Sequence, residues 1–152
     1  MTEPISLNSS SARFELPFLY PAQAQKELFV NEAFSRIDAL LHPVVEGSIA
    51  SPPPSPADGE SWIVASGAVA EWSGRDGSIA HSAAGSWLFF QPRDGMIAFD
   101  RSLDQFVHYR SGWIVAEKPQ APDGGTTVDL EARAAIAELL EQLSSIGLFS
   151  RV

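Results

Sequence analysis

The most restrictive feature of the sequence is the repeated interruption of residues 60–117 by glycine-containing turns. Between the turns lie runs of four to six residues, rich in Trp, Phe, Ile and Val, which favour β-strands. The Asp-Gly pairs at 76–77 and 94–95 suit hairpin turns because they tolerate positive φ angles. The region therefore predicts a small antiparallel sheet of hairpins with six or seven short strands, the first two at 61–65 and 68–72.

A weak internal echo runs through the same region. The sequence GSIA at 77–80 leads to a Trp at 87, and GMIA at 95–98 leads to a Trp at 113. The two units have unequal spacing, so they do not make a true repeat array.

A helix precedes the strands. Val30, Phe34, Ile37 and Leu41 recur at steps of four, three and four, which predicts an amphipathic helix over about 22–41. Pro43 ends it, because the residue before a proline avoids the helical region. We expect the β-rich region to pack on this apolar stripe.

A second helix is predicted from Leu130 to about 146, capped by Thr127 or Asp129 and stopped by Gly147. Its apolar positions step by four, three, four and three, the spacing of a coiled-coil seam over about two heptads. An isolated helix of this length is marginal in water, so it must pack on its own domain or on other copies. We favour other copies, because a Gly-Gly linker separates the helix from the β region. The expected oligomerisation residues are Ile136, Leu139, Leu140, Leu143 and Ile146, with Ala132 beginning the seam.

The expected fold class is therefore α+β: an N-terminal helix packed on a small antiparallel β-sheet of hairpins, with a C-terminal oligomerisation helix. The segments are a flexible arm at 1–12, an extended segment and helix at 13–50, a proline-rich spacer at 51–59, the β module at 60–117, a linker at 118–127, and the C-terminal helix and tail at 128–152.

Composition excludes several classes of function. A net charge of −9 argues against a protein that binds nucleic-acid backbones, which needs a basic surface. No apolar run is long enough to span a membrane, and the N-terminus lacks the charged start and apolar core of a secretory signal. The absence of cysteine excludes disulfides and thiolate metal sites.

The sequence predicts no catalytic residues, no metal site and no cofactor. His42, His81 and His108 are far apart and form no metal-binding motif. An enzyme would rest on unassigned carboxylates, which lie mostly in turns where an acid serves the backbone. These carboxylates are Asp58, Glu60, Asp94, Asp100 and Asp104.

The four tryptophans, at 62, 72, 87 and 113, are the best candidates for ligand binding. Alternation along a strand would place Trp87 and Phe89 on one face and Leu88 and Phe90 on the other. Both faces are apolar, so one is expected to meet the helix and the other a neighbouring chain. If an exposed aromatic platform for glycan exists instead, Trp72, Trp113 and Tyr109 are its expected members.

The stretch before the strands also carries a family likeness. Its opening block is LPF at 16–18, QAQKE at 23–27, NEA at 31–33 and DAL at 38–40, followed by markers at 56–64, 72–74, 77–80, 85–87 and 92–95. Over roughly residues 13–115 the chain resembles the domain of unknown function 2793 family. That family occurs in virion proteins of phages and gene transfer agents, including head-spike and tail-fibre components. The resemblance implies a particle component and supplies no catalytic residues.

This resemblance implies a virion protein, made in the bacterial cytoplasm, with capsid, spike or tail proteins as partners. Its expected particle-docking residues are Gln23, Gln25, Lys26, Asn31 and Glu32; the alternative is that Gln23, Gln25 and Asn31 only cap loops and hold the sheet on the helix. A homo-oligomer is expected, and the spike and fibre setting favours a trimer, although Ile at a with Leu at d more often favours two strands. The second candidate function is a receptor-binding module for host surface polysaccharide.

Overall fold

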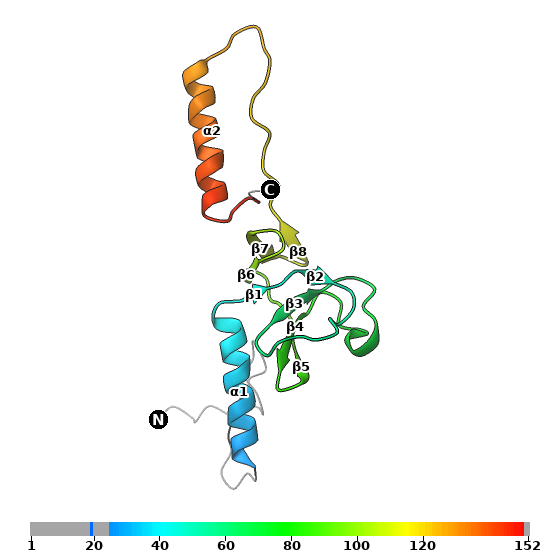
Figure 1. Ribbon diagram of the computed structural model, residues 1–152. Helices are drawn as coiled ribbons and strands as arrows, with labels where there is room; N and C mark the ends of the chain where they lie inside the picture. The colour runs from blue at the N-terminus through cyan, green and yellow to red at the C-terminus, as the bar shows by residue number, and fades with distance from the viewer. Residues whose placement is uncertain (1–18, 20–24, 151–152) are drawn as a thin grey trace, which may run out of the picture.

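The computed structural model describes Leu19 and residues 25–150, and the arm expected at 1–12 lies outside them. Helix α1 (Lys26–Leu41) and helix α2 (Leu130–Ser145) extend from opposite ends of a β module (Figure 1). None of the helices in the described part of the chain is long and apolar enough to cross a membrane.

The β module contains two four-stranded sheets. Sheet A has the order β1-β6-β7-β8 and sheet B the order β2-β3-β4-β5. In each, a two-residue strand pairs in parallel with the first strand of a three-stranded antiparallel meander. The strands are β1 (Val44–Val45), β2 (Ser48–Ile49), β3 (Ser61–Val64), β4 (Ile79–Ala83), β5 (Ser86–Phe90), β6 (Ile97–Asp100), β7 (Gln105–Tyr109) and β8 (Trp113–Val115).

The α+β class is therefore confirmed, but the single antiparallel sheet of the prediction was wrong. The strand expected at 68–72 was also wrong, since Ala70–Trp72 form a 3-10 turn, η1. Ala70 adopts a φ of 54°, which is incompatible with a strand. The internal echo matched GSIA of β4 with GMIA of β6, and Trp87 of β5 with Trp113 of β8. In the two sheets β5 and β8 do occupy equivalent positions, but the strand equivalent to β6 is β3 and not β4.

One short segment, residues 43–50, joins the two sheets. The carbonyl of Pro43 accepts the Phe99 N–H at 2.9 Å in sheet A, and the carbonyl of Gly47 accepts the Ile63 N–H at 3.0 Å in sheet B. Gly47 lies where the segment crosses between the sheets, and an added Cβ there would meet Ser102 Oγ at 3.1 Å. Because the segment supplies an edge strand to each sheet, the two meanders form one unit.

Two apolar clusters hold the module together. The larger combines buried side chains of both sheets, and Ala39 and Leu40 of α1 pack against it; its members are Val45, Ile63, Ile79, Phe90, Ala98 and Val107. The smaller lies on the other face of sheet B and contains Trp62, Val64, Trp72 and Ala80. Trp87 joins it, with its ring centroid 5.0 Å from that of Trp72. Thus η1, rather than a neighbouring chain, covers the Trp87 face of sheet B.

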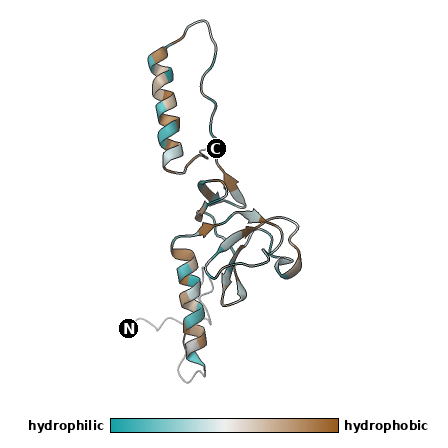
Figure 2. Cartoon of the chain, viewed as in Figure 1, coloured by the Kyte–Doolittle hydropathy of each residue, from teal (hydrophilic) through white to brown (hydrophobic). Residues whose placement is uncertain are grey.

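Helix α1 has the predicted stripe, but the stripe does not face the β module. Phe34 is 63% exposed and Leu41 66%, and Ile37 is exposed beside them. Only the last part of α1 reaches the core, through Ala39 and Leu40 on another side of the helix. The prediction that the β region packs on the stripe was therefore wrong. Figure 2 shows hydrophobic residues along α1, which projects well beyond the sheets.

Helix α2 begins and ends as the sequence indicated. Asp129 Oδ1 accepts the Ala132 N–H at 2.9 Å and caps the first turn. Gly147, with a φ of 77°, ends the helix, and its carbonyl accepts the Phe106 N–H at 2.6 Å. The Arg133 guanidinium donates to the carbonyls of Pro122 and Gly124 in the linker. Helix α2 is thus hydrogen-bonded to β7 at its C-terminal end and to the linker near its N-terminal end.

Candidate functional site

The expected oligomerisation residues of α2 divide into an exposed and a buried group. Ile136, Leu139 and Ile146 are exposed, Leu139 by 57% and Ile146 by 65%. Leu143 is half-buried, and Leu140 is buried at 9% exposure. The helix therefore packs on its own chain through Leu140, while most of its seam remains in solvent.

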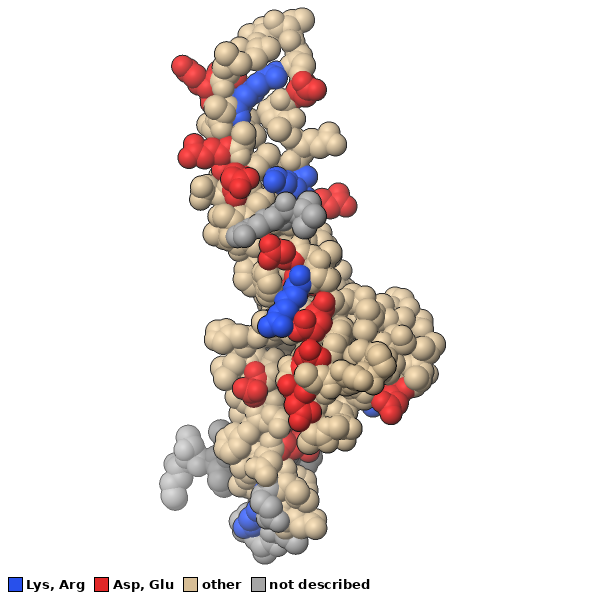
Figure 3. Space-filling view, viewed as in Figure 1, with Lys and Arg blue, Asp and Glu red and all other residues tan. Residues whose placement is uncertain are grey.

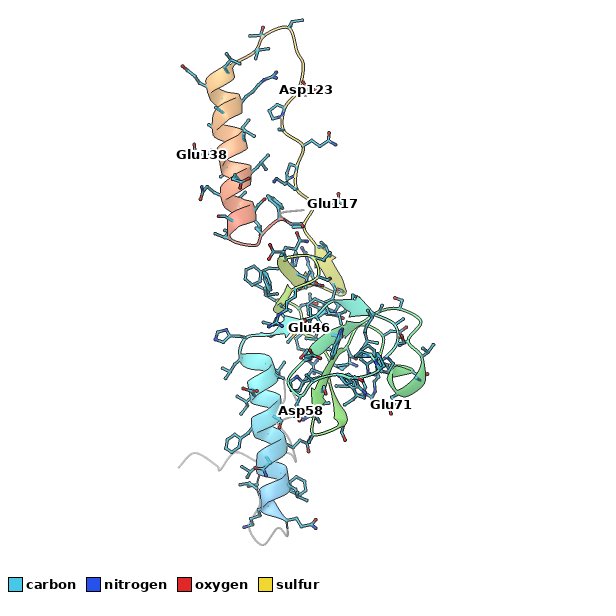
Figure 4. The ribbon with its side chains drawn as sticks, in the orientation of Figure 1. Glu46, Asp58, Glu71, Glu117, Asp123 and Glu138 are labelled. Atoms are coloured by element: carbon cyan, nitrogen blue, oxygen red, sulfur yellow. The ribbon has the colours of Figure 1, made fainter. Side chains whose placement is uncertain are left out.

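The acids of α2 lie away from this seam. If Ile136 and Leu143 occupy heptad position a, the flanking e and g positions hold Arg133, Ala135, Leu140 and Gln142. None of these is acidic, although the chain carries a net charge of −9. Figure 4 shows Glu138 projecting from α2 away from the linker. The seam can therefore meet a second copy without bringing carboxylates into direct contact.

The expected docking residues lie at the far end of α1 from the sheets. Gln25, Lys26 and Asn31 are exposed, and the Glu32 carboxylate forms an ion pair with Arg36 at 2.9 Å. Gln23 lies outside the described residues. Among the described residues, no side-chain hydrogen bond of Gln25 caps α1. The alternative, that Gln23, Gln25 and Asn31 only cap loops and hold the sheet on the helix, stays a prediction.

Tyr109 and Trp113 line one groove between the edges of the two sheets. Their ring centroids are 5.4 Å apart in an edge-to-face arrangement, and Trp113 Nε1 donates to the Gly77 carbonyl at 2.9 Å. The groove has a volume of about 520 Å³, and its polar lining includes Ser66, Asp76 and Ser111. Sequence reasoning selected the two aromatic residues but missed their polar neighbours, which come from distant turns.

The Asp76 carboxylate belongs to this groove and to its supporting turn. Its two oxygens accept the backbone N–H groups of Gly67 and Ala68 at 3.0 and 3.1 Å. These hydrogen bonds stabilise the charged form and lower the pKa of Asp76 below its usual value. The groove thus combines two aromatic rings with a carboxylate that stays ionised.

Trp72 takes no part in this groove. It is fully buried, against Trp62 and Trp87, and its indole Nε1 has no hydrogen-bond partner among the residues that the structure describes. The prediction that Trp72 belongs to an exposed platform was therefore wrong. The glycine turn after it does not expose the ring, because η1 folds the ring onto sheet B.

Three of the candidate carboxylates serve the backbone of turns. Asp94 accepts the Ser111 N–H at 2.7 Å, Asp100 accepts the Ser102 N–H at 2.9 Å, and Glu60 accepts the Ala57 N–H at 2.8 Å. Among the described residues there is no group of three or more His, Asp or Glu side chains that could hold a metal ion. Acidic side chains gather instead in a strip over the front of the β module (Figure 3).

Comparison with known proteins gives one finding. A family model described as a protein of unknown function, DUF2793, matches residues 30–114. No curated protein matches the chain. The match spans the C-terminal part of α1 and both sheets and ends within β8, before α2.

Proposed function

Because the chain belongs to the DUF2793 family of proteins of unknown function, we propose that it is a structural component of a phage-like particle. It would dock on the particle and assemble with copies of itself in a head spike, a head fibre or a tail fibre of a phage or gene transfer agent. The exposed seam of α2 is the observation on which this proposal rests.

An exposed apolar seam is energetically unfavourable for a monomeric protein. Ile136, Leu139 and Ile146 expose large apolar side chains on a helix that touches the β module only near its C-terminal end. Burying such side chains contributes roughly 1.5–3 kcal/mol each. Self-association would recover this free energy, which supports an assembly role.

The N-terminal end of α1 supplies the proposed docking element. Lys26 and Asn31 lie in the 16-residue helix α1 and Gln25 is its N-cap, and all three side chains are exposed. They lie far from α2, so docking and self-association can use separate surfaces (Figure 1).

Particle incorporation tests the docking role. Gln25 and Lys26 would both be changed to Ala, and purified particles would be analysed for the protein. The double variant should be lost from particles while remaining folded. Its matched control changes Lys118 and Gln120, an exposed Lys and Gln in the linker, to Ala; this protein should incorporate normally. Normal incorporation of the α1 variant would contradict the proposed docking element.

A second function, binding of host surface polysaccharide, is favoured by the groove of Tyr109 and Trp113. Sugars stack on aromatic faces while neighbouring polar groups bind their hydroxyls, and Asp76, Ser66 and Ser111 provide such groups. On a glycan array, Trp113→Ala should abolish binding and Ile114→Ala, in the same strand, should not. Equal binding by wild type and Trp113→Ala, or no binding by either, would count against this function.

A further inference from the structure

The C-terminal half of α1 carries an apolar surface that nothing in the described chain covers. Phe34, Ile37 and Leu41 are all exposed and line one hollow of about 420 Å³. Asp38 is the one charged residue among its described lining residues. This surface lies nearer the sheets than the docking residues at the other end of α1.

The surface continues from α1 onto sheet A. Leu41 also lines a second hollow, of about 450 Å³, with Ile97, Phe99 and Phe106. The remaining lining residues are His42, Pro43 and Val44, so the described lining of the hollow contains no Asp, Glu, Lys or Arg. Ile97 is 55% exposed, and Phe106 is exposed beside it.

The same surface then reaches α2. Phe99 and Phe106 pack edge to face, and both rings lie against Gly147 at the end of α2. The residues on either side of Gly147, Ile146 and Leu148, are exposed. We use the term apolar flank for the apolar residues of the two hollows together with the two exposed residues beside Gly147, namely Phe34, Ile37, Leu41, Ile97, Phe99, Phe106, Ile146 and Leu148. The α2 seam at Leu139 and Ile136 precedes Ile146 in the sequence.

The apolar flank and the seam together are large for a free surface. Nine of their ten residues are exposed, all but Phe99. Monomeric proteins rarely expose large contiguous apolar patches, and such patches mark interaction sites. A surface with this many exposed apolar side chains is therefore typical of a protein interface.

Charge favours a second copy as the occupant. A basic partner would be attracted to acids, which are absent from the described lining of the sheet A hollow, and a membrane surface would require flanking Lys or Arg. A second copy carries the same charge of −9, so copies approach most favourably through surfaces that carry few acids. The described lining of the two hollows includes a single acid, Asp38 in the α1 hollow.

We propose that a second copy of this chain covers the apolar flank, with the copies side by side and pointing in the same direction. Each of α1, β6–β7 and α2 then lies next to its counterpart. The parallel direction is part of the proposal: it places each apolar element against its own counterpart and identical seam residues in one layer, whereas antiparallel copies would place α1 beside α2. The inference rests on the self-association proposed above and extends it from two heptads of α2 to the length of the molecule.

Disulfide trapping tests this arrangement, because the natural chain contains no cysteine. Single cysteines would replace Ile37, Ile97 and Leu139, one in α1, one in β6 and one in α2. All three full-length variants should form covalent dimers on mild oxidation, since cross-linking requires Cα atoms within about 7 Å. Exposed positions away from the apolar flank and seam, Glu71→Cys and Glu138→Cys, serve as matched controls and should remain monomeric on denaturing gels.

The outcomes separate the inference from the proposals on which it depends. Cross-links at 139 but not at 37 or 97 would overturn it and leave assembly through α2 intact. Cross-links only when 37 and 139 variants are mixed would mean antiparallel copies and would also overturn it. Failure of Q25A/K26A to alter particle incorporation, with cross-links at all three positions, would overturn the docking element alone.

A second variant tests the same interface without requiring that two cysteines lie within bonding distance. Ile97→Asp places a carboxylate in the centre of the sheet A hollow at an exposed position, so the fold should survive. The oligomer should dissociate at least tenfold more readily than wild type in sedimentation. An unchanged dissociation constant would overturn the proposal.

Discussion

Ser61 Oγ lies 2.9 Å from His81 Nδ1 where β3 and β4 pair, and both residues are buried. Removal of the imidazole from water disfavours its charged form, so the pKa of His81 lies below its usual value of 6.5, although Asp38 and Asp58 partly oppose this effect. The hydrogen bond pairs two buried polar side chains in strands that also carry the buried core residues Ile63 and Ile79.

The first prediction concerns pH. The folded state holds a neutral His81, and the unfolded chain takes up a proton at higher pH than the folded chain does. The contribution to stability is therefore fully present above about pH 6.5 and is lost as the pH falls toward the lower folded pKa.

Urea unfolding at a series of pH values from 8 to 5 measures this effect. The free energy of unfolding of wild type should fall below pH 6.5, and that of His81→Gln should fall less steeply. The two proteins differ only in the side chain at position 81, so the difference in slope reports on the imidazole of His81. Parallel curves would contradict the assignment.

The second prediction concerns the tryptophan cluster. Trp72→Ala removes a fully buried ring from contact with Trp62 and Trp87 and should lower the free energy of unfolding by about 3–5 kcal/mol. Val69→Ala, at an exposed residue just before η1, should change it by less than about 0.5 kcal/mol. A small effect of Trp72→Ala in chemical denaturation would show that the cluster does not stabilise the fold.

The third prediction concerns the attachment of α2. An added Cβ at Gly147 would lie 3.3 Å from the Phe106 ring, at a φ of 77°, so Gly147→Ala should cost about 1–2 kcal/mol locally. The Phe106 amide, which donates to the Gly147 carbonyl, should then exchange hydrogen faster. The matched control is Gly124→Ala, at a φ of 71° with open space around it in the linker, which should leave exchange at Phe106 unchanged.

The helices were predictable from the sequence because their signals are local. The 3.6-residue period and Gly147 predicted the bounds of α2 to within about one residue, and Pro43 predicted where α1 ends. Periodicity also identified the stripe of Phe34, Ile37 and Leu41. It could not show that Ala39 and Leu40, on another side, would contact the core, since a period does not say which neighbour covers a face.

The division into two sheets could not be predicted in the same way. It depends on residues 44–49 pairing with β3 and with the distant β6, and two-residue strands have no periodicity. The exposure of Phe106 was not predictable either, because alternation alone does not show that the face with polar Gln105, rather than the face with Phe106, is buried. The sheet A hollow required the structure, since its residues come from α1, β1, β6 and β7.

The central claim, self-association through exposed apolar surfaces, is tested most directly by measuring mass with light scattering, with and without residues 126–152. The full chain should have the mass of several copies, with three favoured, and the shortened chain should have a lower mass at the same concentration. A full chain that remains monomeric at every concentration would contradict the account.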